Sequence, residues 1–214
     1  MYVVLFEVHP RSEKWDDYLG LAKLLKPELE AIPGFMENIR YRSLTREGWL
    51  LSLSTWRDEK ALVRWRTQAV HHGAQEKGRF EIFGDYHLRV GENIDKRSVE
   101  YADETQVGEG TAVTLIDAKR PADWVKASSP DAVATSLGMQ TDAPGLVAWD
   151  VFEAILTPGD VILALTSRDR KAAEAIEQKL PVSGIVLRRV RIVRDYGMFD
   201  RREAPQYYPD VARR

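Results

Sequence analysis

The chain has 214 residues, a length that suits one large domain or two small ones. Its apolar content of 44% and charged content of 30% are ordinary for a globular protein, and a net charge of −2 gives no broad attraction to nucleic acid or an anionic membrane. The absence of cysteine excludes disulfides, thiolate metal sites and cysteine nucleophiles, and no run of about 18 apolar residues predicts a membrane span. The first residues lack the basic leader of a signal peptide, so we expect a cytoplasmic protein.

The elements predicted for the first half follow the order βαββαβ. Strands are predicted where Val, Leu and Phe are concentrated, and helices where apolar residues recur every three or four positions, as Trp15, Leu19, Leu21, Leu24, Leu25 and Leu29 do. In chain order the elements are a strand at 2–9, a helix at 12–31, strands at 35–44 and 48–56, a helix capped by Asp58, and a strand at 84–91. This order is typical of the ferredoxin-like fold.

The second half repeats the order. Its predicted elements are a strand at 111–118, helical material at 121–137, strands at 146–156 and 160–167, a helix at 169–180 and a strand at 184–194. The polar, glycine-bounded segment 92–109 predicts a linker between the halves. The tail that follows holds several aromatic residues, which we expect to pack on one of the domains because so much exposed aromatic surface is unusual.

Two short motifs recur at one shift of 111 positions. The shift places Arg57-Asp58-x-Lys60-Ala61 on Arg168-Asp169-x-Lys171-Ala172, and Pro33-Gly34 on Pro144-Gly145. Both matches have the same predicted structural context, which indicates duplication. We therefore expect an α+β protein of two tandem ferredoxin-like domains at 1–95 and 108–196, with an aromatic C-terminal tail at 197–214.

The two halves differ between the second helix and the last strand. Arg89-Val90 and Arg189-Val190 occupy similar places on the last strands, yet they lie 100 positions apart instead of 111. The first half therefore has about eleven extra residues within 68–83, and this segment holds two of the four histidines. Extra length combined with titratable side chains makes this segment the best predicted site.

The stretch from Trp56 to Val90 resembles the antibiotic-biosynthesis-monooxygenase (ABM) family. Members commonly begin the second helix with a Trp and a Ser/Asp-Glu-x-Ala pattern, and then carry a Trp, a His, an Ala-Gln, a Gly-Arg and a Tyr on the final strand. The matching residues here are Trp65, His71, Ala74-Gln75, Gly78-Arg79 and Tyr86. The resemblance covers roughly residues 1–92 and implies a dimeric α+β barrel, formed here within one chain; the second half keeps little of the motif.

The resemblance implies an oxygenase that requires no cofactor and oxidises a small planar aromatic molecule of phenol or quinol type in the N-terminal domain. A heme-degrading branch shares a tryptophan at the position of Trp65. That branch has its heme-ligating histidine where this chain has Gln75, and Glu7 stands about where it has an asparagine. Heme binding through His72 or His71 is therefore a second hypothesis, and a non-catalytic small-ligand-binding or assembly protein is a third.

His71 and His72 are the predicted catalytic residues, because an unperturbed imidazole pKa of about 6.5 allows proton abstraction from a phenol at neutral pH. On an unbroken helix His72 shares the face of Trp65, whereas His71 points about a third of a turn away. The alternative for each histidine is a hydrogen-bonded core or wall residue.

The predicted substrate-binding residues are Trp65, Asn38, Tyr86, Gln75 and Arg79. Strand alternation sends Asn38 and Tyr41 to opposite faces of the sheet, and it separates Tyr86 from Arg89 in the same way. The expected partner is a small aromatic molecule, and two chains could also pair as a homo-oligomer. The basic run at 188–194 is too narrow a charged surface for nucleic acid, so we expect no nucleic-acid partner. We also expect no membrane partner and no metal site.

Overall fold

The computed structural model describes residues 1–94, 108–120, 129–180 and 184–213. The first half contains β1 (Tyr2–Pro10), the short 3-10 helix η1 (Ser12–Lys14), α1 (Trp15–Glu30), β2 (Phe35–Ser43), β3 (Leu50–Trp56), α2 (Glu59–Thr67), α3 (Ala69–Lys77), the π-helical turn η2 (Gly78–Ile82) and β4 (Phe83–Ile94). The second half contains β5 (Ala112–Lys119), α4 (Pro130–Ser136), β6 (Leu146–Ala154), β7 (Asp160–Ser167), α5 (Arg170–Glu177) and β8 (Val186–Gly197).

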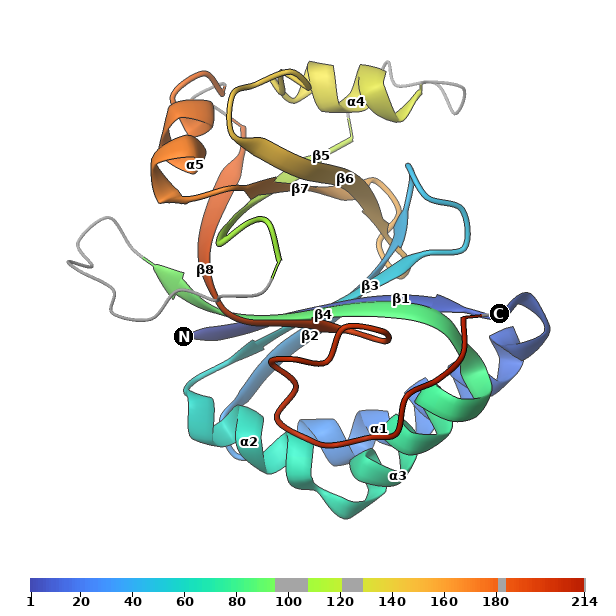
Figure 1. Cartoon of the computed structure of the whole chain (residues 1–214). Helices are drawn as coiled ribbons and strands as arrows, with labels where there is room; N and C mark the ends of the chain where they lie inside the picture. The colour runs from blue at the N-terminus through green and yellow to red at the C-terminus, as the bar shows by residue number, and fades with distance from the viewer. Residues whose placement is uncertain (95–107, 121–128, 181–183, 214) are drawn as a thin grey trace.

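The eight described strands close into one antiparallel barrel in the order β1-β3-β2-β6-β7-β5-β8-β4. Figure 1 shows α1, α2 and α3 outside one side of the barrel, and α4 and α5 outside the opposite side. Each half contributes four neighbouring strands, and the halves meet where β2 pairs with β6 and β4 with β8. The chain is therefore an α+β barrel whose two sheets join along both edges.

Alternation along each strand separates an inner core from two outer ones. On β1, Val3 and Leu5 face the barrel interior with apolar residues of both halves, whereas Val4 and Val8 face the N-terminal helices. The opposite side has its own cluster between the second sheet and the helices α4 and α5. Because the inner core draws on both halves, neither sheet could bury its inner face without the other.

The same local geometry occurs at positions 111 residues apart. Gly34 and Gly145 both have positive φ, at 96° and 83°, and each accepts a hydrogen bond from the backbone of Arg57 or Arg168. Asp58 caps α2 through the backbone N–H of Ala61, and Asp169 caps α5 through that of Ala172, both at 2.8 Å. The sequence repeat thus corresponds to a repeated turn and helix start.

Substituting either glycine by alanine is expected to destabilise the fold by about 2 kcal/mol or more. A Cβ at Gly34 would lie 2.7 Å from the Cβ of Ala61, and one at Gly145 would lie 2.5 Å from that of Ala172, in a backbone conformation that L residues rarely adopt. Chemical denaturation of Gly34→Ala and Gly145→Ala measures the loss. Gly20→Ala is the control, because nothing lies within 4 Å of its Cβ; an equal loss there would contradict the argument.

Several sequence predictions need correction. The helix predicted from Asp58 through Ala69 breaks at Gln68, whose ψ of 132° separates α2 from α3. Of the apolar positions predicted on α1, Leu21, Leu25 and Leu29 face the sheet together with Tyr18. Trp15, Leu19 and Leu24 are exposed, because they lie on the other side of the helix. β8 extends to Gly197, three residues beyond its predicted end.

The predicted correspondence of Arg89 with Arg189 on the last strands was wrong by one position. Arg89 pairs with Leu5 on β1, and in the second half Arg188 pairs with Leu115 on β5. Arg188, and not Arg189, is therefore the counterpart of Arg89. The extra segment of the first half nevertheless lies where it was predicted, as α3 and η2. Most of the predicted linker and the start of the predicted helical segment 121–137 lie outside the described residues.

Candidate functional site

A cavity of about 200 Å³ lies between the helices α1, α2 and α3 and the outer face of the first sheet. We call it the N-terminal cavity. Its wall is mostly apolar and includes Phe6 of β1, Leu25 of α1 and Leu62 of α2. The second half completes it, because Arg194 and Tyr196 at the end of β8 and Pro205 of the tail also line it.

The break at Gln68 places one histidine in this cavity. The Gln68 side chain accepts a hydrogen bond at 2.7 Å from the backbone N–H of His71, and so caps α3. The new helix direction stacks the His71 ring on Trp65, with ring centroids 4.0 Å apart and planes 13° apart. Both residues line the cavity.

His71 is neutral, and its tautomer follows from its partner. Burial lowers the pKa of His71 to about 4, even though its hydrogen bond to the Trp65 carbonyl favours the protonated form. Because a carbonyl oxygen only accepts, Nδ1 donates to it, at 2.9 Å. Nε2 therefore keeps its lone pair and can accept a hydrogen bond or a proton.

Three lining residues hold a buried polar atom without a hydrogen-bond partner. They are Asn38 at Oδ1, Gln75 at Oε1 and Arg66 at Nε. The amide nitrogen of Asn38 donates to Ser52 at 2.8 Å, which leaves the amide oxygen unused. Buried polar groups are normally paired with protein groups or water, so these atoms are available to polar groups of a ligand or to water in the cavity.

The structure brings together four of the seven residues predicted for the site. His71, Trp65, Asn38 and Gln75 line the N-terminal cavity. As predicted, Tyr41 faces away from it, into the barrel core.

The placement predicted for His72 was wrong. It assumed an unbroken helix, and the break at Gln68 exchanges the two histidines: His72 is exposed and lies beside Tyr208. Tyr86 and Arg79 are buried, but they hold the C-terminal tail instead of lining the cavity.

The tail crosses the side of the barrel that carries α1 to α3, in dark red in Figure 1. Arg79, only 2% exposed, donates to the carbonyl oxygens of Met198 at 2.7 Å and Pro209 at 3.0 Å. Arg201 donates to the hydroxyl of Tyr86 at 2.7 Å. The prediction that the tail packs its aromatic residues holds for Phe199 and Tyr208, but Tyr207 is 89% exposed.

A second polar group lies inside the barrel, on the other face of the first sheet. Burial raises the pKa of the Glu7 carboxyl, but Arg89 and Arg46 at 2.6 and 2.5 Å outweigh it and lower the pKa overall. Arg46 also pairs with Asp150 of the second half, and Arg89 donates to Thr166. These contacts join the halves, and they place Glu7 on the face opposite to the N-terminal cavity.

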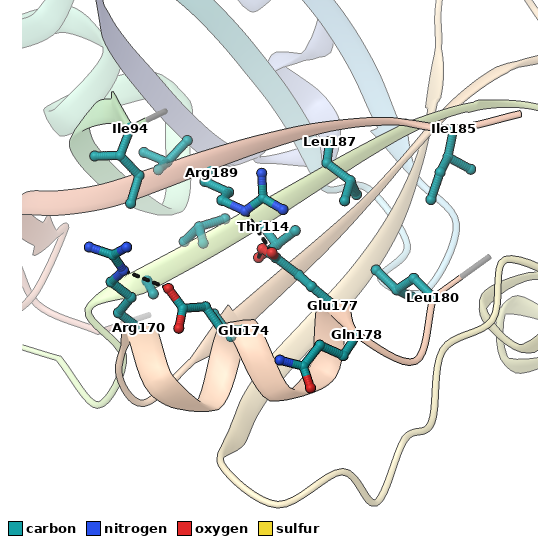
Figure 2. A pocket seen from close by; sticks show the side chains of 14 residues that line it. Ile94, Thr114, Arg170, Glu174, Glu177, Gln178, Leu180, Ile185, Leu187 and Arg189 are labelled. Atoms are coloured by element: carbon teal, nitrogen blue, oxygen red, sulfur yellow. Dashed lines mark hydrogen bonds and ion pairs between the residues drawn. The ribbon is translucent and has the colours of Figure 1, made fainter. Parts of the chain in front are cut away.

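A larger cavity, of about 570 Å³, lies between α5 and the strands β5 and β8 (Figure 2). Its carboxylates already have partners: Glu177 accepts from Thr114 and Arg189, and Glu174 accepts from Arg170. None of its lining residues carries a buried unpaired side-chain atom. The described lining of this cavity therefore lacks the buried unpaired polar atoms that mark the N-terminal one.

Comparison with known proteins agrees with this geometry. The sequence model of the family described as "antibiotic biosynthesis monooxygenase" matches residues 1–77. A protein of Pyricularia oryzae called "Jasmonate monooxygenase ABM" is 45% identical over 221 aligned residues, which cover 99% of this chain and all of that protein. The chain belongs to the antibiotic biosynthesis monooxygenase family.

This ABM protein also resembles solved structures in fold. An aldoxime dehydratase matches with a TM-score of 0.54 at 11% identity, over 89% of this chain and 79% of that one. At this identity the likeness concerns the fold alone. Within the described ranges no helix of the ABM chain has the length and apolarity to cross a bilayer, and no cluster of three or more His, Cys, Asp or Glu residues could hold a metal.

The sequence did not single out the contribution of the second half to the cavity. Arg194, Tyr196 and Pro205 reach it only because β8 pairs with β4 and carries the chain past the N-terminal helices. Arg66 could have been found, because it lies one helical turn after Leu62 and shares its face.

Proposed function

We propose that the chain is a monooxygenase that binds a small organic molecule in the N-terminal cavity, with jasmonate as the first candidate substrate. The observation that carries the proposal is full-length identity of 45% to a jasmonate monooxygenase, combined with a mostly apolar cavity that has unpaired polar atoms. The space of about 200 Å³ suits a ligand smaller than a typical drug molecule.

A planar phenol or quinol is the second candidate. Trp65 and His71 both line the cavity as a stacked pair, and an aromatic ring can pack against the side of this pair that faces the cavity. His71 Nε2 accepts the phenolic hydrogen bond, and loss of that proton gives an electron-rich anion that can pass an electron to O2. With a pKa of about 4, His71 is a weak base, so its main contribution is to position the hydroxyl in a water-poor pocket.

Heme does not fit the cavity as it stands. A macrocycle is larger than the drug-sized ligands that need roughly 300–1,000 Å³, whereas the cavity offers about 200 Å³. The imidazole of His71 also lies flat on Trp65, and His72 lies outside the cavity. We therefore propose a reaction that requires no heme.

The repeated geometry supports the proposal that the chain arose from a duplicated ferredoxin-like unit. Each half shows the βαββαβ order and the strand order β4-β1-β3-β2 or its counterpart β8-β5-β7-β6. We propose domains at 1–95 and 108–196, with the tail at 197–214 and the site in the first domain. A non-catalytic role is less favoured, because side chains do not fill this cavity. We keep a cytoplasmic location as part of the proposal.

Oxygen uptake and product mass with jasmonic acid, and separately with a hydroquinone, test the function. Replacing His71 by Asn keeps an amide N–H near the Trp65 carbonyl but removes Nε2, so kcat/KM is expected to fall at least about 100-fold. His72→Asn is the matched control and is expected to stay within about twofold, since that ring is outside the cavity. Equal activities of the two variants would refute the role of His71, and no oxygen uptake with any substrate would refute the function.

A further inference from the structure

We propose that Arg66 and Arg194 bind a carboxylate of the substrate at one end of the N-terminal cavity, so that both halves of the chain determine specificity for small organic acids. The inference rests on the proposed function only in using the same cavity. It assigns a charge-recognition site to two side chains to which the sequence analysis gave no role.

Arg66 lies on α2 directly after Trp65 and is half-buried. Its Nε is buried without a partner, and within the described ranges its guanidinium has no hydrogen bond and no ion pair. In two other arginines with a buried, unpaired Nε, the other guanidinium nitrogens do have hydrogen-bond partners. Arg79 donates to two carbonyl oxygens, and Arg89 donates to Glu7 and Thr166.

Arg194 reaches the cavity from β8, which belongs to the second half. Its side chain also lacks an ion pair or hydrogen bond to the part of the chain that the structure describes, whereas its backbone belongs to the pairing of β8 with β4. Burial raises the pKa of the neighbouring Tyr196 to about 12, while Arg66 and Arg194 both act electrostatically in the opposite direction. Both guanidinium groups therefore act on the Tyr196 hydroxyl, and all three side chains line the same cavity.

The charges of the wall favour an anion. Three arginines line the cavity, Arg40 with Arg66 and Arg194, against one acid, Glu59, and His71 is neutral. Arg40 acts on the Tyr18 hydroxyl and lowers its pKa against the effect of burial, whereas the side chains of Arg66 and Arg194 have no hydrogen bond or ion pair within the described ranges. A guanidinium presents parallel N–H donors that match the two oxygens of a carboxylate, and the apolar remainder of the wall suits a hydrocarbon body.

Calorimetric titration with paired acids and methyl esters tests the assignment without requiring turnover. The probes are jasmonic acid and 1-naphthylacetic acid, each with its methyl ester, which keeps the shape and removes the charge. The wild-type protein is expected to bind at least one acid about tenfold or more tightly than its ester. Arg66→Gln and Arg194→Gln are each expected to weaken acid binding about tenfold and to leave ester binding within about twofold.

Two further variants sharpen the test. Arg64→Gln removes an exposed arginine of the same helix that does not line the cavity, and it should leave the preference for the acid unchanged. Arg194→Lys keeps the charge and should retain part of the preference. Equal affinity of the wild type for acid and ester, no binding of either acid, or an intact preference in the Arg66→Gln/Arg194→Gln double variant would overturn the proposal.

A different observation would refute the proposed function. Arginine-dependent acid binding without oxygen uptake would retain the carboxylate site and refute the oxygenase. Oxygenation of a neutral phenol without any preference for acids would retain the oxygenase and refute the carboxylate site.

Discussion

Arg79→Met is expected to lower the free energy of unfolding by about 3 kcal/mol and to release the C-terminal tail. The guanidinium is almost fully buried and donates to the carbonyl oxygens of Met198 and Pro209. Methionine keeps much of the volume but leaves both carbonyl groups without this donor, and a buried unpaired acceptor such as that of Met198 costs about 1–3 kcal/mol. Urea denaturation measures the stability, and limited proteolysis followed by mass spectrometry reports cleavage after residue 198.

Arg202→Met is the control for this experiment. Arg202 lies on the same tail but is exposed and pairs with Asp200, so its loss should change stability little. If Arg79→Met were as stable and as resistant to proteolysis as Arg202→Met, the tail would be held by its apolar contacts and not by the buried arginine. Because Pro205 lines the N-terminal cavity, a released tail should also weaken ligand binding.

The burial of His71 predicts that stability falls by about 3 kcal/mol as the pH is lowered from 6.5 to 4. Its folded pKa is about 4, against an unfolded value of 6.5, so between these values the unfolded chain binds the additional proton. The contribution is fully present above pH 6.5 and is lost as the pH falls toward the folded pKa. One pKa unit corresponds to about 1.4 kcal/mol, which gives the expected size.

Urea denaturation of the wild type and His71→Asn at several pH values between 4 and 7.5 checks this prediction. The stability of the wild type should fall more steeply with decreasing pH than that of the variant, by about 3 kcal/mol between pH 6.5 and 4, because the asparagine variant has no imidazole to protonate at this position. His72→Asn should follow the wild-type curve, since that ring is exposed. Parallel curves for wild type and His71→Asn would show that the imidazole is not desolvated in the folded protein.

The charge network inside the barrel explains why the halves act as one structural unit. Glu7 of the first half and Asp150 of the second share Arg46, and Arg89 spans from Glu7 to Thr166. Removing one member would leave buried charge unpaired, which is costly. The apolar inner core has the same composite origin, since Leu5 and Leu115 belong to one cluster.

The sequence by itself determined the order of the elements, the repeated turn and helix start, and the inserted segment whose His71 lines the N-terminal cavity. These features are local: hydrophobic periodicity gives strands and helices, an aspartate caps the helix that follows it, and only glycine readily adopts the positive φ found at Gly34 and Gly145. Strand alternation likewise predicted that Asn38 and Tyr41 lie on opposite faces of the sheet. It made the same prediction for Tyr86 and Arg89, and the structure has both pairs so.

Only the tertiary structure decided which histidine enters the cavity and what closes it. The break at Gln68 is a single change of ψ that hydrophobic periodicity does not mark, yet it moves His71 onto Trp65 and His72 to the surface. Arg194, Tyr196 and Pro205 are more than 100 residues from α2, and they reach the cavity through the pairing of β8 with β4. Such long-range contacts depend on the closure of the barrel, a property of the whole chain that no local sequence pattern contains.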